Sequence, residues 1–143
     1  MSVAEPTLGR VVHHAYLWHR EQRRGQSAGR KERPCVVILL DSDSVPGATI
    51  ASVLPITHSE PRDGDAAIEL KAGTKRRLGL DRERSWIVTD EFNRFTWPGF
   101  DLRPTPDGRP DYGLLPADLT RQLRQQLIAN HHRQRLKAVE RDS

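Results

Sequence analysis

Short apolar runs separated by proline, glycine and polar residues dominate the first two thirds of this chain. The run at residues 35–40 is the clearest, because six successive apolar residues, several of them β-branched, are typical of a buried strand. Several short strands bounded by turn residues favour a small barrel, so the pattern predicts a mainly β fold. The other strand-like runs lie at residues 9–18, 48–56, 66–70, 84–89 and 93–97.

The sequence pattern changes after residue 103. Three prolines and two glycines recur within the next ten residues, which predicts a stiff connector over residues 104–115. Pro116 suits the first turn of a helix, and apolar residues then recur at helical spacing from Leu119 to Ile128. We therefore predict one C-terminal helix over about 116–139.

The length of 143 residues fits a single domain over residues 1–143, with the barrel at about 9–103. The net charge is +4, and arginine supplies 19 of the 23 basic side chains. Because a guanidinium binds phosphate through two parallel hydrogen bonds, an arginine-rich chain is suited to a polyanionic partner. A solvated, arginine-rich surface accounts for the same composition equally well.

Several functional classes are excluded by what the sequence lacks. The single cysteine, Cys35, excludes an internal disulfide framework and a zinc site built on several thiolates. No glycine-rich phosphate loop, serine nucleophile elbow or metal-ligand spacing is present, so we predict neither a cofactor nor a metal. No apolar run could span a membrane, and the first nine residues lack a signal-peptide pattern, so we expect a cytoplasmic protein without membrane association.

Two polar residues lie where predicted strands end. Arg33 precedes Pro34, where a polar loop enters the buried strand, and Thr57 follows the strand at 48–56. If these strands are neighbours, a guanidinium and a hydroxyl meet at one rim, where they can hold a phosphate and neutralise charge that develops on it. Taken singly, a surface ion pair explains Arg33, and a β-branched strand end explains Thr57.

Four sequence blocks resemble, in order and spacing, the MazF/PemK/Kid toxins of bacterial toxin–antitoxin pairs. The blocks are GRVV at 9–12, the glycine-containing loop and Arg-Pro strand at 25–38, VLPIT at 53–57, and TDEFNRFTW at 89–97. The resemblance implies an SH3-like barrel of the CcdB/MazF/Kid type with a C-terminal helix. It also implies a homodimer that is neutralised by a cognate antitoxin protein.

The resemblance further implies an endoribonuclease that cleaves single-stranded mRNA without a metal and so inhibits growth. The substrate 2′-hydroxyl would act as nucleophile and leave a 2′,3′-cyclic phosphate. Arg33 would stabilise the transition state rather than move a proton, because the pKa of a guanidinium is too high for a shuttle, and Thr57 would hydrogen-bond the scissile phosphate. Asp90 matches an aspartate base of some members, although Val88 stands where their arginine lies. His58 is either a proton shuttle or an exposed loop histidine.

The loop after residue 18 is far more basic than the usual acidic version in this family, and its basic side chains either grip the RNA backbone or only solvate the loop. Trp97 is the best candidate for stacking on a base. Glu91 stands where the family usually has glutamine. The predicted RNA contacts are Arg23, Arg24, Gln26, Arg30, Lys31, Arg94 and Trp97.

Two other functions fit the same fold. One is a non-cleaving toxin or binding module, such as a CcdB-like gyrase poison or an RNA- or DNA-binding protein. The other is a degenerate member with a regulatory or structural role. The pairing of Arg33 with Thr57 favours the endoribonuclease, because a gyrase poison needs no phosphate site; the fold alone does not separate the three.

Overall fold

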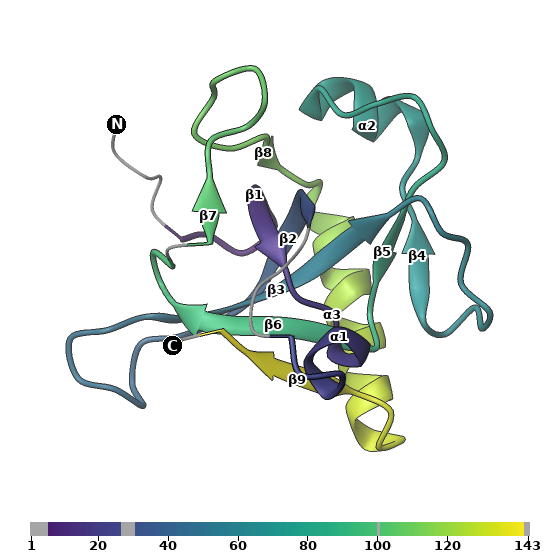
Figure 1. Cartoon of the computed structure of the whole chain (residues 1–143). Helices are drawn as coiled ribbons and strands as arrows, with labels where there is room; N and C mark the ends of the chain where they lie inside the picture. Colours follow the sequence, from purple (N-terminus) through teal and green to yellow (C-terminus); the bar gives the residue numbers. More distant parts are fainter. Residues whose placement is uncertain (1–5, 27–30, 100, 142–143) are drawn as a thin grey trace.

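A computed structural model describes residues 6–26, 31–99 and 101–141, and within these residues the chain forms nine strands and three helices (Figure 1). The protein is mainly β with a C-terminal helix, as predicted. In chain order the elements are β1 (Arg10–Tyr16), α1 (His19–Arg23), β2 (Lys31–Asp41), β3 (Ile50–Thr57), β4 (Ala67–Glu69), α2 (Ala72–Leu78), β5 (Trp86–Val88), β6 (Glu91–Thr96), β7 (Leu102–Arg103), β8 (Gly113–Leu114), α3 (Ala117–His132) and β9 (Lys137–Glu140).

All nine strands belong to one sheet, whose main path runs β4-β5-β3-β2-β1-β7. β6 pairs with the first half of β3 and with β9, and β8 pairs with β1. Every pair is antiparallel except β6 with β9. Over the residues described, no ladder closes the sheet on itself, so the closed barrel stays a prediction.

Side-chain hydrogen bonds join the two sides of this open sheet. The Asn93 side chain of β6 accepts a hydrogen bond from the Leu17 N–H at 3.0 Å and donates to the Leu17 carbonyl at 2.7 Å. The same Asn93 oxygen lies 3.1 Å from Nε2 of His14 in β1. Arg141, which follows β9, donates to the carboxylate of Asp101, which precedes β7, at 2.7 Å. These buried contacts hold β6 and β9 against β1 and β7.

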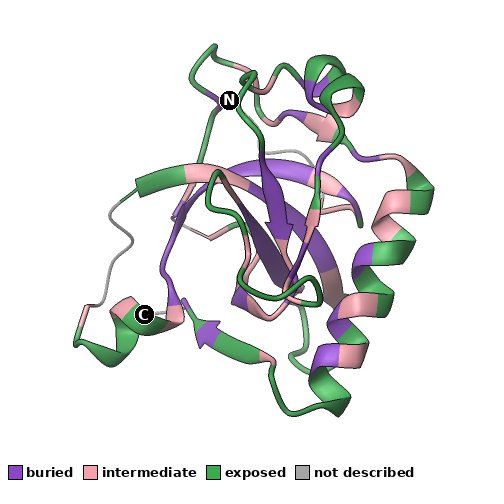
Figure 2. Ribbon diagram, turned by 90° about the vertical axis from the view of Figure 1, so that its right-hand side faces the viewer, coloured by how far each residue is buried: buried purple, intermediate pink, exposed green. Residues whose placement is uncertain are grey.

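The core consists of two apolar clusters, one on each face of the central strands. Val36 and Ile38 of β2 belong to one cluster, and Cys35 and Val37 belong to the other, because successive side chains of a strand point to opposite faces. This double burial explains why residues 35–40 read as an unbroken apolar run. α3 covers the first cluster with its buried stripe and turns its exposed side outward (Figure 2).

The predicted helix over 116–139 is wrong at its C-terminal end. α3 ends at His132, Arg133 is its C-cap, and Gln134 has a φ of 59°, a left-handed conformation that redirects the chain. Residues Lys137–Glu140 then form β9 along the edge of β6, where Val139 is fully buried opposite Asn93. This pairing satisfies backbone groups that an exposed edge of β6 would leave open, and a four-residue strand has no period that the sequence could show.

The shortest elements are not predicted by the sequence pattern. α1 lies in the polar loop, and β7 and β8 have only two residues each. α2 has seven residues and ends at Gly79, whose φ of 73° caps the helix in the left-handed region. No helix within the described ranges is both long enough and apolar enough to cross a membrane.

Candidate functional site

Arg33 and Thr57 face each other across two neighbouring strands. β2 and β3 are antiparallel with Val36 opposite Leu54 and Cys35 opposite Pro55. Continuing this register by two residues places Arg33 opposite Thr57, on the same face of the sheet. The Arg33 side chain reaches β3, because its Nη1 lies 3.5 Å from the Ile56 carbonyl oxygen. The sheet therefore brings a guanidinium and a hydroxyl to one rim.

The guanidinium of Arg33 has no carboxylate partner among the described residues. Its Cζ lies 5.1 Å from the centroid of the Trp18 ring, and its buried Nε makes no hydrogen bond. Arg84 offers a contrast, because it also stacks on a tryptophan but binds both carboxylate oxygens of Glu69, at 2.8 and 3.0 Å. A half-buried arginine without a counter-ion, held in place by an aromatic ring, is suited to bind an anion.

Thr57 lines a pocket of about 340 Å³ at this rim. Its hydroxyl oxygen accepts the N–H of Ser59 at 3.1 Å, which leaves the hydroxyl hydrogen free to be donated. Trp18 lines the same pocket, and so does Arg20, whose guanidinium carbon lies 4.9 Å from the centroid of the Trp18 ring. Arg33 does not line this pocket; it lines a separate pocket that also contains His58, and it is linked to the Thr57 pocket only through the Trp18 ring on which it stacks.

Four carboxyl groups line the same pocket, those of Glu60, Asp63, Asp90 and Glu91. Burial raises the pKa of Asp90, and burial likewise raises the pKa of Glu91. The Glu91 carboxylate accepts hydrogen bonds from the Tyr16 hydroxyl and the His19 N–H, each at 3.0 Å, so it is fixed in position. A carboxylate with a raised pKa is a stronger base than an ordinary one, and Asp90 can therefore take a proton from a group in the pocket.

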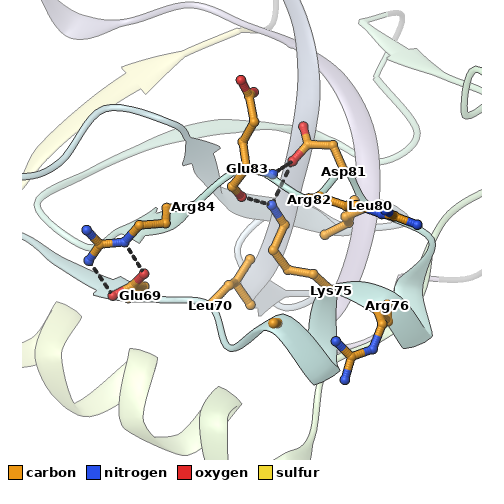
Figure 3. A pocket seen from close by; sticks show the side chains of 10 residues that line it. Glu69, Leu70, Lys75, Arg76, Leu80, Asp81, Arg82, Glu83 and Arg84 are labelled. Carbon is orange, nitrogen blue, oxygen red and sulfur yellow. Dashed lines mark hydrogen bonds and ion pairs between the residues drawn. The ribbon is translucent and has the colours of Figure 1, made fainter.

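The structure does not bring His58 into this pocket. His58 follows Thr57 directly, so it points away from that pocket and lines a different one, together with Arg33, Pro34 and Ile56. Its two ring nitrogens lie 2.8 Å from Asp81 and 3.1 Å from Glu83. A larger pocket of about 570 Å³, between α2 and residues 80–84, contains none of the predicted site residues (Figure 3).

The predicted RNA contacts are spread over several elements. Arg23 is exposed in α1, Arg24 is its exposed C-cap, Gln26 follows half-buried, and Lys31 is exposed at the start of β2. In β6, Arg94 pairs with Glu140 of β9 at 3.2 Å. Trp97 stacks on Phe95 with ring centroids 6.1 Å apart. Arg30 lies outside the described residues.

Sequence reasoning did not identify Trp18, Arg20 and Glu91 as members of the site. Trp18 directly precedes α1, whose five residues are too few to show a helical period, and Glu91 is distant from them in the chain. The Glu91 hydrogen bonds to residues 16 and 19 join these segments only in the folded chain.

Fold and site together define a mainly β domain in which Arg33, which has no carboxylate partner within the described ranges, lies opposite the strand-end Thr57, whose pocket includes the half-buried Asp90 and Glu91. Comparisons of the chain with protein-family models, with curated proteins and with solved structures find no match.

Proposed function

We propose that this protein is a metal-independent endoribonuclease that resembles the MazF/PemK/Kid toxins and cleaves single-stranded RNA. The observation that carries the proposal is the Arg33 guanidinium, which has no carboxylate partner in the described residues and lies opposite Thr57. A phosphodiester supplies the anion that this arginine lacks, and Thr57 still has a hydroxyl hydrogen to donate to it.

The proposed reaction uses the substrate's own nucleophile. Asp90 takes the proton of the RNA 2′-hydroxyl, and the 2′ oxygen forms a bond to phosphorus. The bond from phosphorus to the 5′ oxygen breaks, solvent protonates that oxygen, and a 2′,3′-cyclic phosphate remains. Arg33 and Thr57 donate hydrogen bonds to the phosphate oxygens as negative charge develops on them, which is the kind of stabilisation that lowers such a barrier most.

The finer fold assignment is part of the same proposal. The buried side-chain bridges from Asn93 to β1 and from Arg141 to Asp101 support an SH3-like barrel, because they bring the open sides of the sheet together. On this proposal the chain works as a cytoplasmic homodimer and is inhibited by a cognate antitoxin protein. Arg23, Arg24 and Lys31, beside the rim, then contact the RNA backbone.

A cleavage assay in excess EDTA tests the proposal. Long labelled RNA is incubated with the purified protein and with Arg33→Ala, Thr57→Val and Arg84→Ala variants. We expect discrete cuts with cyclic-phosphate ends, a loss of about 10²- to 10³-fold in rate for Arg33→Ala, and about tenfold for Thr57→Val. Arg84→Ala is the matched control, since it removes an arginine that stacks on a tryptophan but is already bound to Glu69.

Three outcomes would contradict the proposal: intact RNA across varied sequences, cleavage that EDTA abolishes, or equal losses in Arg33→Ala and Arg84→Ala. RNA that is bound but not cut would indicate the non-cleaving binding module instead, and inhibition of DNA gyrase would indicate the CcdB-like alternative.

A further inference from the structure

A second group of polar side chains lies on the opposite face of the sheet from Thr57. His58 follows β3, and Asp81 and Glu83 lie in the segment between α2 and β5. Nε2 of His58 is 2.8 Å from an Asp81 carboxylate oxygen, and Nδ1 is 3.1 Å from a Glu83 carboxylate oxygen. One ligand atom from each of the three residues lies within 4.8 Å of the other two. Two segments that are far apart in sequence thus place three ligand-bearing side chains together, with Asp81 and Glu83 on different ring nitrogens of His58.

A buried lysine fixes one of the two carboxylates. Lys75 of α2 is only 4% exposed, and its ammonium donates to Asp81 Oδ1 at 2.7 Å and to the Glu83 carbonyl (Figure 3). It also donates to Ser85 Oγ at 2.6 Å. The Glu83 N–H also donates to Asp81 Oδ1, at 3.1 Å. Because Oδ1 is already occupied, Oδ2 is the oxygen that faces His58. Hydrogen bonds of this kind orient carboxylate ligands in metal sites.

We propose that His58, Asp81 and Glu83 form a binding site for a divalent cation of the zinc class. An imidazole nitrogen and two carboxylate oxygens are ligands that Zn²⁺ and Co²⁺ accept, with solvent in the remaining position. The 2.8 Å between His58 Nε2 and Asp81 Oδ2 is a hydrogen-bond distance, and two ligands of one tetrahedral zinc ion lie about 3.3 Å apart, so a small movement of the exposed His58 and Asp81 side chains makes room for the ion. Glu83, whose side chain is 71% exposed, completes the set by rotating about its side-chain bonds.

The position of the site gives the cation a structural consequence. It ties the residue after Thr57 to the segment between α2 and β5, next to the ladder in which Thr57 of β3 pairs with Trp86 of β5. The bound ion therefore adds a cross-link just beyond the end of this ladder. Although His58 and Asp81 line one pocket with Arg33, this inference does not rest on the proposed ribonuclease, because it is argued from the three ligands alone and its test measures metal binding.

A titration of EDTA-treated, buffer-exchanged protein with Co²⁺ tests the site. We expect a visible absorption band that saturates at one ion per chain, is displaced by Zn²⁺, and is accompanied by a rise in the thermal unfolding midpoint. His58→Ala and Glu83→Gln are each expected to weaken Co²⁺ binding by about 10- to 100-fold. Glu83→Gln is the safer variant for folding, because Lys75 contacts only the backbone carbonyl of Glu83.

His132→Ala is the matched control, because His132 is also an exposed histidine and lies beside His131 at the end of α3. It is expected to leave the titration unchanged. The proposal is overturned if Co²⁺ and Zn²⁺ do not bind the folded chain, if His132→Ala weakens binding as much as His58→Ala does, or if both ligand variants bind as the parent protein does. In these cases His58 serves only as an ion-pair partner of Asp81 and Glu83.

Discussion

His14 is a fully buried histidine that the fold keeps neutral. Asn93 Nδ2 donates to a carbonyl, so its Oδ1 is the acceptor that faces His14, and the imidazole proton sits on Nε2. Nδ1 is buried without a hydrogen-bond partner. Burial lowers the pKa of His14 to about 4, chiefly because the charged ring would lose its water, and Arg141 and Arg103 lie near enough to add repulsion.

This shift predicts a loss of stability in mild acid. His14 takes up a proton near pH 6.5 in the unfolded chain but only near pH 4 in the folded chain. The stability that the folded chain has with His14 neutral is therefore fully present above pH 6.5 and is lost as the pH falls toward 4. Its size is about 3 kcal/mol. Urea unfolding at several pH values measures it, and His14→Gln, which retains a donor for Asn93, is expected to flatten the curve between pH 6.5 and 4. An unchanged curve in the variant would refute the assignment to His14.

Strand alternation explains which part of the candidate site the sequence could predict. The placement of Arg33 opposite Thr57 requires only that the strands carrying them be neighbours, and β2 and β3 are neighbours. The same alternation sends His58 to the opposite face from Thr57. The contacts of Trp18 with Arg20 and Arg33 depend on how a five-residue helix packs, which no sequence pattern specifies.

At the level of elements, α3 is anchored through a narrow apolar stripe. Leu123 and Leu127 are 0% and 2% exposed and pack in the first core cluster, whereas Ile128 is 47% exposed. Leu123→Ala is expected to lower the free energy of unfolding by about 2–5 kcal/mol, because it removes buried surface and leaves a cavity. Ile128→Ala makes the same kind of truncation on the exposed side and is expected to change stability by less than about 1 kcal/mol. Chemical denaturation followed by circular dichroism measures both, and similar losses would show that α3 packs differently.

The helix and strands differ in how far the sequence could define them. β1, β2 and β3 were predictable because runs of buried or alternating apolar residues are long enough to show a pattern. The start of α3 was predictable from Pro116 and the leucine spacing, but its end was not. β9 forms because β6 offers an open edge there, and that edge exists only after the sheet has assembled.

For the molecule as a whole, the open sheet depends on buried polar contacts where its sides meet. The Asp101–Arg141 ion pair is the charged one, with side chains only 10% and 6% exposed, and it connects the residue before β7 to the residue after β9. Asp101→Asn removes the negative charge from this buried pair, so we expect the free energy of unfolding to fall by about 3–5 kcal/mol. Glu140→Gln breaks the neighbouring pair with Arg94, whose side chains are 58% and 38% exposed, and is expected to cost less than about 1 kcal/mol.

Urea unfolding of both variants separates two accounts of the molecule. A large loss in Asp101→Asn alone means that this buried pair holds the sides of the sheet together where no ladder does. Equal, small losses would mean that the strand ladders and the two apolar clusters suffice, and the buried pair would then contribute no more than a surface pair. Hydrogen exchange of the β9 amides distinguishes global from local unfolding. If the sheet opens only where Asp101 meets Arg141, the β9 amides lose protection first, while the pairing of β2 with β3 persists.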